Sequence, residues 1–203
     1  MNIEVDRSNM KIVGNDLVIG LTPDLRKTLG LEKICVGDIA VGETFYGGKY
    51  IVVGQCMQNE THVVCLEPIR DVVFGNTNDY RSSNLRKKLN NEYRLELENI
   101  FGIGSLIERR TSLHSLDGVG DYGIIVDKVT PLTFDQYRIY RKDIGFYAEG
   151  EWTCTPWSTP SASGEKHDVI YIDYDGSIGA ASCVESMCVR PIFTLKSSTK
   201  VQK

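Results

Sequence analysis

The feature that most constrains how this sequence can fold is one long stretch of apolar residues with helical spacing. The rest of the chain consists mainly of short β-prone runs. Four apolar residues recur at intervals of four: Leu85, Leu89, Tyr93 and Leu97. This spacing predicts an amphipathic helix whose apolar side chains lie in the core. Ser82 or Ser83 can cap its first turn. A single strong helix among many short strands predicts an α+β fold.

Short β-prone runs bounded by turn residues make up most of the remaining sequence. The runs cover residues 10–13, 17–21, 38–41, 49–56, 61–66, 124–129, 168–172 and 189–195. A second, short helix is expected over 133–140. Pro191 lacks a backbone N–H, so we expect the last run to lie at a sheet edge or to contain a bulge.

The chain is expected to have three parts. Residues 1–30 combine a β-hairpin with a short helix over 22–30, and this arm would serve docking or oligomerisation. The main domain is expected over 31–197. The polar residues 198–203 are expected to form a frayed tail.

Composition excludes several classes of partner. The formal net charge of −4 gives no general attraction to nucleic acid or to an anionic membrane. No apolar run approaches the roughly 20 residues that span a bilayer. The first residues lack the positive and apolar stretches of a secretory signal. We therefore expect a protein made in the cytoplasm, with neither a nucleic-acid nor a membrane partner.

The cysteines lie too far apart in the sequence to indicate a disulfide framework or a structural zinc site. The six are Cys35, Cys56, Cys65, Cys154, Cys183 and Cys188. No Cys-x-x-Cys pair occurs, and disulfide staples would require an oxidising compartment. We expect most of them to be buried free thiols.

An ordered set of motifs resembles an uncharacterised domain family that is widespread in Gram-positive and gut bacteria and in their phages. Residues 82–90, SSNLRKKLN, resemble the S-x-L-R-x-W-L-N helix of that family. Residues 127–133, DKVTPLT, resemble its D-K-V-F-L-L-S segment. WTCTP at 152–156 stands where the family has W-W-L-R-S-P.

The two ends of the domain also resemble this family. Gly37-Asp38 with 50–53, YIVV, resembles its opening strand, G-x-y-x-W-x-V-L. Asp175-Gly176 with 188–192, CVRPI, resembles its closing D-G … G-V-R-P-A. Two departures matter: Thr155 replaces the arginine of L-R-S, and Cys188 replaces the glycine before V-R-P. Any contact made by the family arginine is therefore absent here or supplied differently.

The family is similar to the C-type-lectin-like and formylglycine-generating-enzyme-like fold group. The resemblance implies a small twisted antiparallel sheet, one or two helices, and a long irregular segment near the C-terminus that faces the ligand. It implies a non-enzymatic binding protein without a cofactor, such as a phage virion accessory or receptor-binding component. Expected partners are a cell-surface glycan or protein, other virion proteins through the arm, and further copies of the chain.

The ligand-facing segment is expected over 146–167. Loops on a rigid scaffold often carry binding, and aromatic side chains supply contact area with few rotors. The candidate binding residues are Phe146, Tyr147, Glu151, Trp157 and His167. Trp152, in the same segment, is expected in the core. Arg190 is expected to form a structural ion pair with Asp173 or Glu151.

Two other functions remain open. A purely structural virion protein would pack the aromatic segment against neighbouring subunits. A copper-dependent oxidase would use Cys183 and Cys188, whose spacing resembles the copper-binding pair of formylglycine-generating enzymes, and two thiolates suit Cu(I). Carboxylates at Asp173, Asp175 and Glu185 lie on a turn without a calcium loop, so no metal site is expected there. Motifs of the common hydrolases are absent from the sequence.

Overall fold

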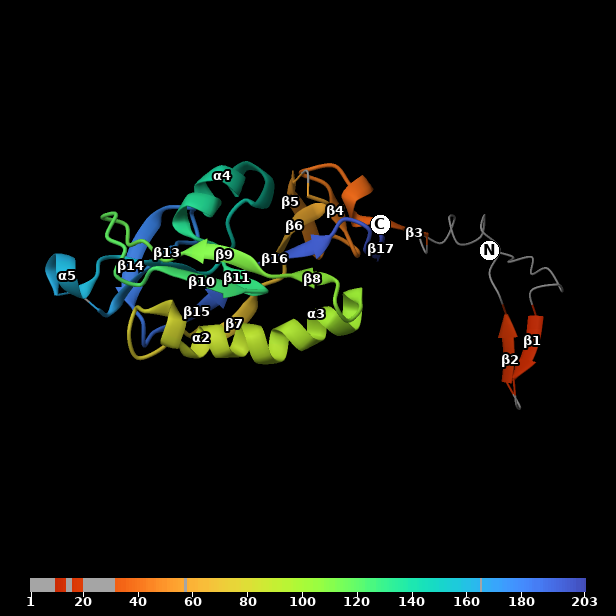
Figure 1. Ribbon diagram of the computed structural model, residues 1–203, viewed down its shortest axis with the longest axis horizontal. Helices are drawn as coiled ribbons and strands as arrows, with labels where there is room; N and C mark the ends of the chain where they lie inside the picture. The colour runs from red at the N-terminus through yellow and green to blue at the C-terminus, as the bar shows by residue number, and fades with distance from the viewer. Residues whose placement is uncertain (1–9, 14–15, 20–31, 57, 165) are drawn as a thin grey trace.

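Two β-sheets at the centre of the protein carry the rest of the fold (Figure 1). The computed structural model describes residues 10–13, 16–19, 32–56, 58–164 and 166–203. Strand pairing in these residues is antiparallel with one exception, and helices are few. The α+β prediction is thus confirmed.

The larger sheet has six strands. It contains β11 (Val129–Pro131), β16 (Pro191–Lys196), β6 (Glu60–Cys65), β5 (Tyr50–Cys56) and β4 (Thr44–Phe45) in that order, and β8 (Leu106–Ile107) also pairs with β16. Pro191 therefore begins a central strand, and the expected edge position is wrong. The first residue of a strand tolerates proline because its missing N–H leaves the rest of the ladder intact.

The smaller sheet has five strands. Its order is β14 (Ile178–Ser182), β13 (Asp168–Ile172), β12 (Glu151–Pro156), β15 (Ser186–Val189) and β7 (Ile69–Val73). β12 and β15 form the one parallel pair among the described strands, through Glu151 and Cys188. Arg190 alone separates β15 from β16, so the chain passes from one sheet to the other at this residue.

Each side of the larger sheet packs against a different helix. Along β5, Tyr50 and Val52 belong to the main core, whereas Ile51 and Val53 belong to a second cluster. This alternation follows from the two-residue period of a strand. The main core includes the long helical segment, and the second cluster includes Tyr137 of α4. Figure 1 shows the two helical elements on opposite sides of the strands.

The long helical segment contains a widened middle. It consists of α2 (Asn84–Lys87), the π-helical η4 (Lys88–Tyr93) and α3 (Arg94–Phe101). The Ser83 hydroxyl caps its start, accepting from the Arg86 N–H at 3.0 Å. All four residues of the predicted stripe are buried, which confirms the helix and its core face. The π turn was not expected.

The second predicted helix is α4 (Phe134–Ile144). Thr133 and Gln136 form a capping box at its start, which satisfies two backbone donors. The remaining elements are α5 (Pro160–Ser163), β9 (Arg109–Ser112), β10 (Ile124–Asp127), β3 (Lys33–Cys35), β17 (Lys200–Gln202), β1 (Met10–Val13), β2 (Asp16–Ile19), and the short turns η2 (Val36–Asp38) and η3 (Tyr80–Ser82).

Near the two ends of the domain, the structure confirms the predicted hairpin and corrects the predictions of a frayed tail and of a strand over 38–41. β1 and β2 pair as the predicted hairpin, while the helix expected over 22–30 lies outside the described residues. The expected frayed tail instead forms β17, which pairs with β3. Val201 is fully buried there, and the apolar contact with the main core holds the tail. The strand expected over 38–41 is absent, since the chain turns at η2.

None of the helices in the described ranges is long and apolar enough to cross a membrane.

Candidate functional site

Strand β12 divides the predicted binding residues into two groups. Phe146 and Tyr147 precede this strand, whereas Trp157 follows it and extends the ladder by donating its N–H to the Asp168 carbonyl at 3.0 Å. Six extended residues span roughly 20 Å. The segment 146–167 is therefore not one irregular surface, because a buried strand runs through its middle.

Glu151 is not a surface ligand, which corrects the prediction. Its carboxylate is 1% exposed and accepts two hydrogen bonds from Arg190, at 2.6 and 2.8 Å. The Tyr147 backbone N–H donates a third hydrogen bond to it at 3.1 Å. A buried carboxylate requires partners of this kind. The predicted ion pair of Arg190 is confirmed, and Glu151 is its partner. Trp152 is also buried as predicted, with its indole N–H donating to the Val72 carbonyl at 2.9 Å.

At one end of β12, Tyr147 is held by its own neighbours. The Arg70 guanidinium donates to the Tyr147 hydroxyl and pairs with the Glu149 carboxylate. The same guanidinium lies 5.4 Å from the centre of the Tyr147 ring. Phe146 is 51% exposed beside this cluster. The polar groups at this end are thus satisfied within the protein.

At the other end of β12, Trp157 lines a surface cavity of about 410 Å³. The cavity is lined by Leu116, Asp117, Trp157, Ser158 and Ser163, which we call the Trp157 face. Trp157 and Leu116 are 46% and 39% exposed, so two large apolar side chains meet solvent side by side. Exposed aromatic surface next to fixed polar groups is typical of a ligand site.

Hydrogen bonds hold the polar part of the Trp157 face in place. The Ser158 hydroxyl donates to the Asp117 carboxylate at 2.7 Å, and the Ser115 hydroxyl donates to its other oxygen. These bonds, that from Ser115 first, lower the pKa of Asp117 below its usual value. Leu116 donates its backbone N–H to the Pro156 carbonyl at 2.9 Å, which ties the 113–119 loop to the end of β12.

A second carboxylate anchors the short helix α5 beside this face. Asp121 accepts from the hydroxyl of Ser161 at 2.6 Å and from its backbone N–H at 3.0 Å. The hydroxyl bond is the main cause of the lowered pKa of Asp121. The serine-rich stretch after Trp157 is therefore attached to the loop that carries Asp117.

A smaller cavity of about 160 Å³ is also lined by Leu116. Thr155, which stands where the resembled family has arginine, lines it and accepts from the Phe134 N–H at 2.9 Å. Ser112 and His114 also line it, and the Ser112 hydroxyl contacts Nδ1 of His114. The two residues are neighbours on one turn, whereas a catalytic triad needs an acid on the second ring nitrogen. Among the described residues no acid bonds to His114.

His167 lies at the same end of the sheet as Trp157 but outside the cavity lining. Its side chain is exposed, and its carbonyl accepts from the Cys183 N–H at 2.8 Å. Of the five predicted residues, Trp157 alone lines the Trp157 face. Leu116 and Asp117 were missed, and the one available signal was the Asp117-Gly118 turn.

The cysteine pair of the oxidase hypothesis is buried. Cys183 and Cys188 are at most 1% exposed, and the Cys188 thiol donates to the Glu149 carboxylate at 2.9 Å. Burial, together with Glu149, raises the pKa of Cys188 to about 12. Within the described ranges, no three His, Cys, Asp or Glu side chains are gathered to hold a metal ion.

The chain matches no protein-family model, no curated protein and no solved structure.

Proposed function

We propose that this protein is a non-enzymatic binding domain of the C-type-lectin-like kind, and that it recognises a carbohydrate on a cell surface through the Trp157 face. The observation that carries the proposal is the pairing of a 46%-exposed indole with an oriented carboxylate in one cavity. A phage virion component that attaches to a host envelope would use such a face.

The chemistry of the face suits a sugar. The C–H groups of a pyranose pack against an aromatic ring, and Trp157 with Leu116 supplies an apolar platform. A carboxylate offers about four acceptor sites. At Asp117, the hydroxyls of Ser115 and Ser158 each occupy one of them. The remaining sites can accept from sugar hydroxyls. Because Asp117 is already oriented, little ordering is required on binding.

The proposal is tested by binding of the purified protein to a glycan array and to bacterial cell-envelope fractions. We expect saturable binding that falls at least tenfold in Trp157→Ala. Phe146→Ala is the matched control, since Phe146 is similarly exposed but lies at the other end of β12. Asp117→Asn should weaken binding while Trp157 stays in place.

Two results would contradict the proposal. One is the absence of binding by a folded sample, and the other is an equal loss in the Trp157 and Phe146 variants. Stoichiometric incorporation into phage particles without glycan binding would instead support the structural virion role.

A further inference from the structure

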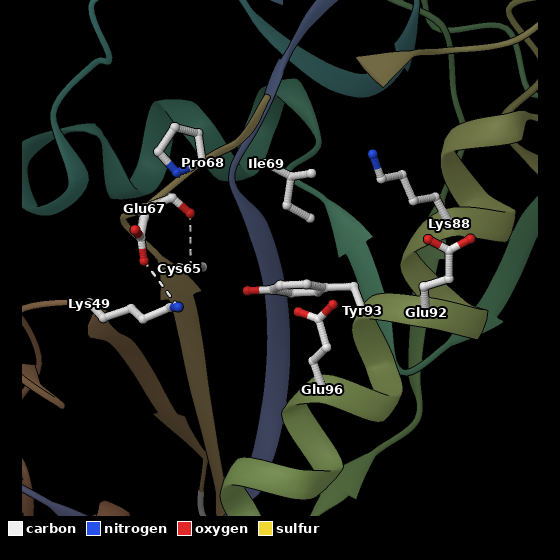
Figure 2. A pocket seen from close by; sticks show the side chains of 9 residues that line it. All are labelled: Lys49, Cys65, Glu67, Pro68, Ile69, Lys88, Glu92, Tyr93 and Glu96. Carbon is white, nitrogen blue, oxygen red and sulfur yellow. Dashed lines mark hydrogen bonds and ion pairs between the residues drawn. The ribbon is translucent and has the colours of Figure 1, made fainter. Parts of the chain in front are cut away.

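A third cavity, of about 250 Å³, lies between the β6–β7 connection and the helical segment (Figure 2). Its inner wall includes Cys65, Ile69 and the ring of Tyr93. Charged side chains surround its mouth: Lys49, Glu67, Lys88, Glu92 and Glu96. The volume lies just below the range of pockets that hold drug-sized ligands, so it suits a smaller molecule.

The π-helical turn η4 supplies much of this cavity. Lys88, Glu92 and Tyr93 all belong to η4, and the Arg94 N–H bonds to the Leu89 carbonyl five residues back. A π turn brings residues five apart onto the same side, so Lys88 and Tyr93 both face the cavity. Such turns are rare and concentrate at functional sites.

Tyr93 brings a buried hydroxyl to the cavity, close to the Cys65 thiol. The residue is 9% exposed, and its hydroxyl makes no hydrogen bond of acceptable geometry with the described residues. Figure 2 shows the ring reaching from the helix toward Cys65. Burial raises the pKa of both Tyr93 and Cys65, so both stay protonated. A buried hydroxyl in this state is stabilised by a ligand that bonds to it.

The charges at the mouth are mixed and only partly paired. Lys49 pairs with Glu67 at 3.0 Å. Lys88, Glu92 and Glu96 form no ion pair within the described part of the chain. The mouth therefore offers one ammonium and two carboxylates to a bound molecule, next to an apolar wall.

We propose that this cavity binds a small zwitterion of the α-amino acid class. The ammonium group of the ligand lies by Glu92 and Glu96, its carboxylate by Lys88, and its side chain against Ile69 and the Tyr93 ring. A ligand group also bonds to the Tyr93 hydroxyl. The site is separate from the Trp157 face and does not depend on the carbohydrate proposal.

The test is a titration of the ¹⁵N-labelled protein with a panel of L-α-amino acids, followed by amide chemical shifts. The matching simple amines and carboxylic acids, each lacking one charged group, form the comparison arms. We expect at least one amino acid to give saturable shifts at Cys65, Ile69 and η4. Amines and acids alone should bind at least tenfold more weakly.

Variants locate the site. Glu92→Gln with Glu96→Gln should weaken binding at least tenfold, whereas Glu108→Gln with Glu185→Gln, two exposed glutamates elsewhere, should leave it unchanged. Tyr93→Phe should weaken binding about three- to tenfold without loss of folding, because the removed hydroxyl makes no hydrogen bond of acceptable geometry with the described residues. Trp157→Ala should bind the amino acid normally.

Absence of saturable shifts in the folded wild-type protein would overturn the proposal. So would shifts that survive the glutamate double substitution, or an amine that binds as tightly as the amino acid.

Discussion

The Arg190 guanidinium and the Glu151 carboxylate form a bidentate ion pair that is buried in the protein. Nε bonds to Oε2 at 2.6 Å and Nη2 to Oε1 at 2.8 Å, while both side chains are at most 3% exposed. Arg190 also donates to the carbonyls of Ile144 and Gly145, at 2.7 and 3.1 Å. The pair thus joins the junction of the two sheets to β12 and to the end of α4.

Removing one partner of this pair should strongly destabilise the protein. Arg190→Met leaves a buried carboxylate unpaired, which costs about 3–5 kcal/mol of unfolding free energy. Arg138→Met is the control, because the Arg138–Asp135 pair is exposed and 3.4 Å long, and its loss should cost at most about 1 kcal/mol. Urea denaturation measures both. Similar small changes in the two variants would refute this account.

The caps of the two helical segments should each stabilise the fold by a measurable amount. Ser83→Ala and Thr133→Ala remove oxygens that accept from backbone N–H groups, at 3.0 and 3.1 Å. Each should lower the unfolding free energy by about 1 kcal/mol. Ser82→Ala is the control, since the exposed Ser82 hydroxyl caps no helix. A thermal or urea melt in which Ser82→Ala costs as much as Ser83→Ala would contradict the assignment.

His62 should make stability depend on pH between about 4 and 6.5. Burial, with the nearby charge of Arg109, lowers the pKa of His62 from 6.5 to about 4. In this window the unfolded chain binds a proton that the folded chain does not, so stability falls as the pH falls. With allowance for solvent screening, the loss is on the order of 1–2 kcal/mol.

The variant His62→Gln isolates this contribution. Glutamine can keep a contact with the Thr194 hydroxyl, which lies 2.8 Å from Nδ1 of His62, but does not titrate. The difference in urea midpoints between pH 4 and pH 7 should be smaller in the variant than in the wild type. The carboxylates titrate in both proteins, so their contribution cancels. An unchanged difference would rule out His62 as its source.

The C-terminal strand should contribute to folding. Val201→Ala removes two buried methyl groups from β17 and should cost about 1–2 kcal/mol. Ser198→Ala, at an exposed position just before this strand, should change stability by less than about 0.5 kcal/mol. Equal effects in a urea titration would mean that β17 does not pair in solution.

The helical segments were predictable because their signals are local. The caps and the apolar stripe lie within one stretch of sequence. The π turn also corresponds to a feature of the sequence, the strict four-residue spacing of the buried residues. In an α-helix each four-residue step advances about 40° around the axis, so the three steps from Leu85 to Leu97 would drift by about 120°. The wider turn of η4 absorbs this drift, and the strict four-residue spacing was its signature.

Strand β12 was missed because it has no alternation to detect. All six residues from Glu151 to Pro156 are buried, so both faces are covered and the polar residues are satisfied internally. Thr153, for example, donates to the Ile170 carbonyl at 2.7 Å. Strands of this kind lack the two-residue period that identifies half-exposed strands.

The candidate site was predictable only in part. Trp157 was identified because an aromatic residue among small polar ones suggests a binding loop. Its neighbours Leu116 and Asp117 come from a loop some forty residues earlier, and only tertiary pairing brings them together. Glu151 was named both as a binding residue and as one of two possible partners of Arg190, and the tertiary structure shows that it is the buried partner.

Strand β12, all six residues of which are buried, separates two aromatic residues that flank it in the sequence. Tyr147 precedes the strand and Trp157 follows it, and the six-residue strand itself spans roughly 20 Å. A single monosaccharide bound at the Trp157 face therefore leaves the Tyr147 end uncovered, and the two ends of the strand can be altered independently of each other.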